Sequence, residues 1–152
     1  MKHRVISLVL VFVLIISLFT LECLAADTSK TEIEYLEDGS YIITTTQEVY
    51  VRATNTKVGT RTKSQYDSDN VLDWQVILRG EFTYTGTSST CTSSTISVNI
   101  YDSAYSKVSS SSSKSGNTAN GSATISRKVL GVTVATNTYP LSLSCDKNGN
   151  LY

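Results

Sequence analysis

The sequence predicts an all-β protein, folded as one antiparallel β-sandwich of about seven to nine strands. In the segment Leu72–Tyr84, apolar and polar residues alternate, and only Ile77 breaks the pattern. Such alternation is typical of a strand with one buried and one wet face. The composition is rich in Ser, Thr and Tyr and holds one proline, which favours strands. No stretch after the N-terminal apolar run has helical periodicity. A small β-barrel is the alternative architecture.

The other strands are expected between turn signals at Asp38-Gly39, 67–70, 86–89 and Leu130-Gly131. The serine run at 109–113 predicts either a flexible connection or an exposed edge strand. Gly80 allows a bulge or the close approach of another segment. Alternation or strand-like composition predicts the remaining strands over residues 33–35, 41–46, 48–57, 60–64, 96–100, 123–129, 132–136 and 141–145.

The N-terminus has the order of a secretory signal: a positive start at residues 2–4, an apolar run over 5–21 and small residues at Ala25 and Ala26. We therefore expect a signal peptide over residues 1–25, a flexible lead-in over 26–31 and a single β-sandwich domain over 32–152. The protein is expected to be secreted. The alternative is an uncleaved signal that anchors it in the membrane, whereas Glu22 before Cys23 disfavours a lipid anchor.

The cysteines predict one disulfide. Cys23 leaves with the signal, so the exported part retains Cys91 and Cys145, which are 54 positions apart. Two cysteines in an oxidising compartment most simply form one bridge, and a loop of that size gives about 4 kcal/mol in the chain-entropy model. The alternative is two buried thiols. Cys91 also has the wrong parity for the 96–100 strand, so either a bulge lies at 93–95 or Cys91 lies in the preceding turn.

Charge and histidine content exclude several classes of function. The exported part carries 11 Lys and Arg against 12 Asp and Glu, which leaves no electrostatic footprint for nucleic acid. The only histidine is His3, within the signal, so histidine-based triads and histidine-ligated zinc are excluded. Residues 146–150 place oxygen side chains at alternate positions, as calcium loops do, but an Asx-rich turn is the simpler interpretation. No cofactor and no metal is predicted.

The part after the signal resembles a family of small exported proteins from Gram-positive bacteria, a domain of unknown function. The resemblance covers most of that part. It implies no activity and no catalytic residue, but it suggests that Cys91 and Cys145 belong together. The matching segments are 38–41, 52–54, 74–86, 101–104, 115–119, 130–132 and 143–149.

The leading hypothesis is an exported, non-enzymatic binding domain, whose partner is a cell-wall polymer, a glycan or a protein. Tyr101 and Tyr105 are the aromatic candidates for its ligand surface, and Arg61 and Lys63 are the basic ones. Membrane contact is expected only through an uncleaved signal or through insertion.

Two alternatives remain. The first is a membrane-active or pore-forming protein, because Ser/Thr and apolar residues alternate over 93–126. The second is a glycoside hydrolase that uses paired carboxylates. Glu32 and Glu34 share one strand face, whereas Asp73 and Glu81, both expected on a wet face, lie roughly 26 Å apart along one strand.

Overall fold

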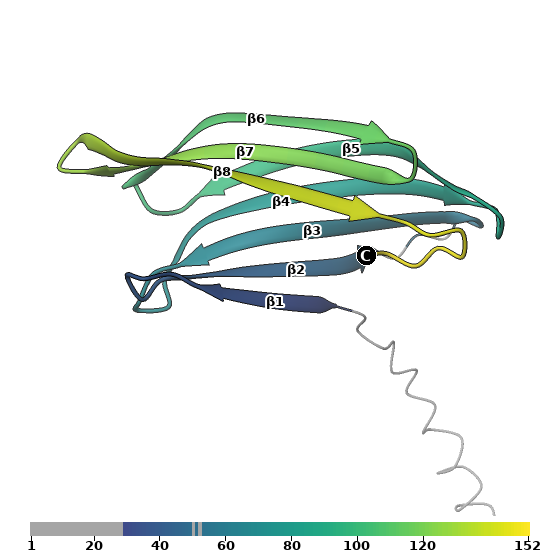
Figure 1. Cartoon of the computed structure of the whole chain (residues 1–152), viewed down its shortest axis with the longest axis horizontal. Helices are drawn as coiled ribbons and strands as arrows, with labels where there is room; N and C mark the ends of the chain where they lie inside the picture. Colours follow the sequence, from purple (N-terminus) through teal and green to yellow (C-terminus); the bar gives the residue numbers. More distant parts are fainter. Residues whose placement is uncertain (1–28, 50, 52) are drawn as a thin grey trace, which may run out of the picture.

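The computed structural model describes residues 29–49, 51 and 53–152, and these residues form eight strands (Figure 1). The predicted signal peptide and the first part of the lead-in lie outside the described residues. Within the described part of the chain, no helix is long and apolar enough to cross a membrane. The strands are β1 (Lys30–Tyr35), β2 (Tyr41–Val49), β3 (Thr56–Tyr66), β4 (Leu72–Tyr84), β5 (Ser89–Ile100), β6 (Tyr105–Ser115), β7 (Thr118–Val129) and β8 (Val132–Ser144).

The strands form two antiparallel sheets, which confirms the predicted sandwich over the barrel. Five strands pair in the order β1-β2-β3-β4-β5, and three pair in the order β6-β7-β8. Every pairing joins strands that are consecutive in the chain, so each sheet is a meander of hairpins. The chain passes from one sheet to the other only between β5 and β6. Strands β7 and β8 pack over β3, β4 and β5 (Figure 1).

The core lies between β4 and the smaller sheet. From Trp74 to Phe82 the even-numbered residues of β4 face inward as the alternation predicts, and Trp74, Val76, Leu78 and Phe82 are completely buried. The core also includes Ile42 of β2, both cysteines, Ala119, Ala123 and Ile125 of β7, and Leu141 and Leu143 of β8. Gly80 and Gly121 let the sheets approach closely, since a Cβ atom on Gly80 would lie 2.7 Å from the Phe82 ring and 3.1 Å from Ala119.

β-Bulges explain the positions at which side chains stop alternating between the two faces of a strand. The register skips Asp73 in β4, Thr92 in β5, Val108 in β6 and Val134 in β8. The bulge at Thr92 turns Cys91 into the core, so the expected bulge is found one residue before the predicted position. Asp73 was expected on the wet face, and this prediction is wrong: the bulge re-aims its side chain, which is buried.

The serine run is an exposed edge strand, β6, rather than a flexible connection. It closes one side of the sandwich through hydrogen bonds to the edge strand β5 of the other sheet. Ser112 Oγ donates to the Ser94 carbonyl oxygen at 3.1 Å, and Lys114 Nζ donates to that of Thr92 at 2.6 Å. At the other end of the chain, β1 begins at Lys30, so the last residues of the expected lead-in belong to a strand.

The predicted disulfide is wrong. Cys91 and Cys145 are both free and both buried in the core cluster. Their backbone N–H groups bond to consecutive residues of the β6–β7 turn, Cys91 to the Gly116 carbonyl at 2.8 Å and Cys145 to that of Asn117 at 3.1 Å. Each cysteine is therefore positioned by the β6–β7 turn and by core packing, and its side chain serves as a small apolar group.

Candidate functional site

The side of the sandwich opposite β6 is open. The larger sheet extends past β8, so β1 and β2 have no strand of the smaller sheet above them (Figure 1). Strand register puts Arg61 opposite Leu78 and Lys63 opposite Val76, on the face that forms the core. Because directly opposite residues share a face, these two basic side chains point inward, beside the core. The inner face of the sheet thus changes from apolar on β4 to charged on β3.

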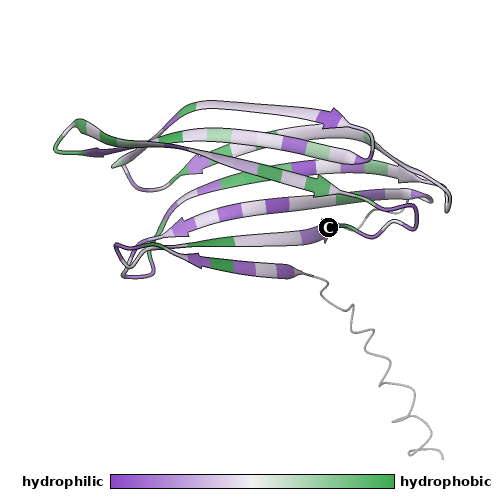
Figure 2. Cartoon of the chain, viewed as in Figure 1, coloured by the Kyte–Doolittle hydropathy of each residue, from purple (hydrophilic) through white to green (hydrophobic). Residues whose placement is uncertain are grey.

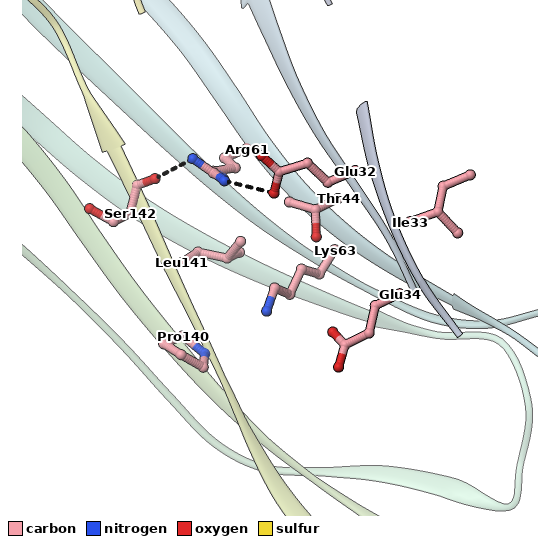
Figure 3. Close-up of a pocket in the computed structure, with 9 residues that line it drawn as sticks. All are labelled: Glu32, Ile33, Glu34, Thr44, Arg61, Lys63, Pro140, Leu141 and Ser142. Carbon is pink, nitrogen blue, oxygen red and sulfur yellow. Dashed lines mark hydrogen bonds and ion pairs between the residues drawn. The ribbon is translucent and has the colours of Figure 1, made fainter. Parts of the chain in front are cut away.

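This open side holds a groove of about 440 Å³ between β8 and the inner face of β1–β3 (Figure 3). Its floor is formed by Thr44, Arg61 and Lys63. Glu32 and Glu34 form the wall on β1, where Ile33 points away from the groove (Figure 3). The opposite wall is the segment of β8 at Pro140, Leu141 and Ser142.

The edge of β8 is closed to a further strand. The guanidinium of Arg61 donates from Nη1 to the Ser142 carbonyl oxygen at 3.3 Å and pairs through Nη2 with Glu32 at 3.5 Å. Pro140, two residues earlier, has no N–H to offer. Inward-pointing charges and proline are the features that protect sheet edges from strand addition. A ligand in the groove is therefore recognised by side chains and not by strand pairing.

Lys63 and Glu34 provide the available charges. Neither has an ion-pair partner among the residues that the structure describes, and both charged groups point into the groove (Figure 3). An ammonium group donates three hydrogen bonds, and a carboxylate only accepts them. The groove therefore presents donors from β3 and acceptors from β1 to the same ligand.

Two further, separate hollows lie on the same side of the sandwich, and we call the groove and these two hollows together the trench. One, of about 130 Å³, includes Asp38, Arg127 and Tyr139, and the other, of about 210 Å³, includes Glu48 and Lys57. The ion pairs Arg127–Asp38 and Lys57–Glu48 lie at these two ends. The β3 residues of the three hollows run from Lys57 to Gln65, a span of roughly 26 Å at the strand rise. The trench is a row of three hollows, interrupted between Lys57 and Arg61 by the Leu143 and Leu151 side chains over Gly59, and its charges are balanced.

The four predicted ligand-surface residues do not form one surface. Arg61 and Lys63 lie side by side in the groove. Tyr101 is exposed in the β5–β6 turn. Tyr105 is half-buried at the start of β6, where its hydroxyl accepts a hydrogen bond from Gln65 Nε2 at 3.0 Å. The alternation of β3 showed that its basic residues share a face, but only the tertiary structure shows that this face is the inner one.

Sequence reasoning missed a row of tyrosines on the outer face of the larger sheet. Register aligns Tyr35, Tyr41 and Tyr66 across β1, β2 and β3. The rings of Tyr41 and Tyr66 stack at 5.2 Å between centroids with an interplanar angle of 10°, and Tyr35 and Tyr41 lie 5.9 Å apart. The stacking of Tyr41 on Tyr66 makes this row a cross-strand ladder that stabilises the sheet, and Tyr35 at its end is 76% exposed.

An acidic pocket of about 240 Å³ lies at the end of the sandwich that holds the β1–β2, β3–β4 and β5–β6 turns. Burial raises the pKa of the Asp73 carboxyl, against the effect of its hydrogen bond with Tyr105, and nearby Asp102 and Asp67 raise it further. Burial and the charge of Asp73 raise the pKa of Tyr105 to about 12. Among the described residues, no three His, Cys, Asp or Glu side chains converge as metal ligands.

Residues 146–150 form an Asx turn. The carboxylate of Asp146 accepts hydrogen bonds from the backbone N–H groups of Asn148 and Asn150, both at 2.8 Å, and from the Asn150 side-chain amide at 2.8 Å. These bonds lower the pKa of Asp146. The segment therefore has the hydrogen bonds of an Asx-rich turn, which is its simpler interpretation.

Fold and site together define an open-sided β-sandwich with a charged trench beside its core. Comparison of the chain with protein-family models, with curated proteins and with solved structures finds no match.

Proposed function

We propose that this protein is an exported, non-enzymatic domain that binds a glycan chain along the open side of the sandwich. The observation that carries the proposal is the trench itself, in which Lys63 and Glu34 are available beside the paired Arg61 and Glu32. The first 25 residues supply the export signal, as their sequence predicts.

The balance of charge favours a neutral polymer. Cations on β3 face acids on β1 and β2 along the trench, so an anionic polymer would meet as much repulsion as attraction. A sugar hydroxyl both donates and accepts hydrogen bonds, and a neighbouring cation and carboxylate satisfy both capacities. The apolar wall of Pro140 and Leu141 supplies contact for the C–H faces of the sugar rings.

Retention of the protein on a panel of polysaccharides tests the proposal. We expect binding to a neutral polysaccharide that changes little with added salt, because surface charge attraction, unlike hydrogen bonding, is screened by salt. Lys63→Gln and Glu34→Gln should each weaken binding about tenfold or more, because a hydrogen bond to a charged group contributes about 1.5–3 kcal/mol. Arg79→Gln is the matched control, because Arg79 lies on the outer face and pairs with Glu81.

The proposal fails if no polysaccharide retains the protein, or if the groove variants bind as the wild type does. Binding that collapses with salt would point instead to an anionic polymer.

One observation favours a second candidate, a glycoside hydrolase. Glu32 and Glu34 both line the groove, and residues two apart on a strand lie roughly 6.7 Å apart between Cα atoms with their side chains on the same face. Two glutamates so placed have carboxyl groups separated by a distance of the same order. Inverting glycosidases hold their two carboxyl groups at about 6.5–9.5 Å. An assay for new reducing ends on the retained polysaccharide separates the candidates: turnover that Glu34→Gln abolishes would establish the enzyme and refute the non-enzymatic proposal.

A further inference from the structure

The β7–β8 hairpin ends in an apolar tip, residues 128–134, which we call the finger. Its exposed fractions are 48% for Val129, 99% for Leu130, 66% for Val132 and 56% for Val134. The hairpin reaches past the other turns at that end of the molecule, and its tip carries apolar residues (Figures 1 and 2). These side chains cover no part of the core, so packing within this chain does not explain them.

The turn itself does not explain the leucine. Leu130 has a φ of 50° and Gly131 a φ of 81°, so both turn residues are in the left-handed region. Two-residue hairpin turns of this kind favour Asn-Gly or Asp-Gly. A leucine at the first position costs about 1 kcal/mol or more. A bulky apolar residue thus occupies a strained position in full contact with solvent, which is a local conflict of the kind found at functional sites.

The apolar side chains of the finger gather at a narrow projection. Val129 lies directly opposite Val132, so these two share a face, and the bulge at Val134 bends the hairpin just behind them. The result is a convex knob only two strands wide. A flat protein surface touches such a knob over a small area, whereas a lipid bilayer deforms around it and buries it on all sides.

The charges behind the tip fit a membrane surface. Lys107 on β6 and Lys128 on β7 are both exposed, and neither takes part in an ion pair within the described part of the chain. Arg127, by contrast, is paired with Asp38 at 3.4 Å. The acidic turns at 36–40, 67–71 and 101–104 are set back from the tip (Figure 1). The finger therefore combines an apolar end with two available cations behind it.

We propose that the finger docks the protein on a lipid bilayer: the side chains of Val129, Leu130 and Val132 enter the boundary between headgroups and acyl chains, and Lys107 and Lys128 face anionic headgroups. Apolar tips with basic flanks bind membranes by this combination of burial and charge. The docking is peripheral and reversible. It leaves the trench along the open side of the sandwich accessible to its ligand.

Sedimentation with vesicles tests this proposal. The chain from Ala26 onward contains all eight strands and the whole core, and it lacks the apolar run that would itself enter a bilayer. We expect it to pellet with vesicles of phosphatidylcholine and phosphatidylglycerol, and more weakly with phosphatidylcholine alone. Replacing Lys107 and Lys128 with Gln should lower binding to the anionic vesicles by roughly fivefold per lysine and leave binding to the neutral ones unchanged.

The decisive variant is Leu130→Asn. Asparagine tolerates the left-handed region, so the thermal midpoint should stay the same or rise. Vesicle binding should fall roughly tenfold to a hundredfold, because the leucine side chain no longer enters the bilayer. The control is Val71→Thr, which removes an exposed apolar group (57%) from the β3–β4 turn and should bind as the wild type does.

The proposal is overturned if the wild-type chain stays in solution with both kinds of vesicle, or if Leu130→Asn binds as tightly as the wild type. It is also overturned if the wild type is a dimer that ignores vesicles and that Leu130→Asn dissociates, because a second copy of the chain then covers the finger. The vesicles contain no polysaccharide, so this result is independent of the test for glycan binding.

Discussion

The free cysteines permit a sharp test through Cys91→Ala and Cys145→Ala, made singly and together. Both thiols are buried in the core and unlinked. Each substitution therefore removes one sulfur atom from packed surroundings, and we expect a loss of about 1 kcal/mol in the free energy of unfolding. The double variant should lose about the sum of the two single losses.

A bridge between the same residues would behave differently. A cross-link over 54 positions would contribute about 4 kcal/mol. Either single substitution would remove all of this, and the second would add little. Reductant would then lower the thermal midpoint by more than about 10 °C for a domain of this size, whereas free thiols predict no change.

Thermal and urea unfolding followed by circular dichroism, with and without reductant, measure these quantities. Alkylation in denaturant without reductant should label both thiols. In the native protein the labelling should be slow, because burial raises the pKa of both Cys91 and Cys145 and only the thiolate is reactive. A denatured chain with no alkylatable thiol, together with a large effect of reductant, would refute the free-thiol structure.

Two further predictions concern the core and the acidic pocket. Gly80→Ala should lower the free energy of unfolding by about 1–3 kcal/mol, since the new methyl group would overlap the Phe82 ring, which is fully buried; an unchanged urea midpoint would show that the sheets can separate there at no cost. Asp73→Asn should remove one contribution to the pH dependence of the free energy of unfolding. The pKa of Asp73 is raised in the folded protein, so its stabilising effect is fully present below its ordinary value of 3.8 and is lost as pH rises through the folded value. The stability of the wild type relative to Asp73→Asn should therefore fall as the pH is raised above about 4, and a difference independent of pH in urea unfolding would contradict this sign.

Strand β4 shows what the alternation of apolar and polar residues predicts correctly and where it fails. From Trp74 to Phe82 the even-numbered residues of β4 are buried as expected, because side chains alternate between faces in any strand. The same rule failed at Asp73, where the bulge adds one residue and reverses the face. It also left open whether the serine run forms a strand. The serine run forms a strand because it pairs with β7 along its length. Composition does not encode this contact between two segments.

The sequence identified most of the charged residues of the candidate site but not their arrangement. Glu32 and Glu34 were assigned to one strand face, and Arg61 and Lys63 were named as ligand residues, but nothing in the sequence placed the two pairs together. They meet because β1, β2 and β3 are neighbours in one sheet, in a register that brings Glu32, Thr44 and Lys63 into line. In the β8 wall, Leu141 and Ser142 were expected only as part of a core strand, and Pro140 was assigned to no strand.

By itself the sequence determined the fold class, the turns after β1, β3, β4 and β7 and the face of most strands, because hydrophobic alternation and turn chemistry are local properties of the chain. The strand expected over 48–57 is wrong, because the turn between β2 and β3 lies within it. Only the tertiary structure decided that the two sheets differ in width and that the charged face of β3 turns inward. It also left one side of the sandwich open and the two cysteines unlinked. Those features depend on which distant segments pack together and on how the bulges shift their register. Such contacts are settled by the burial of the whole core at once.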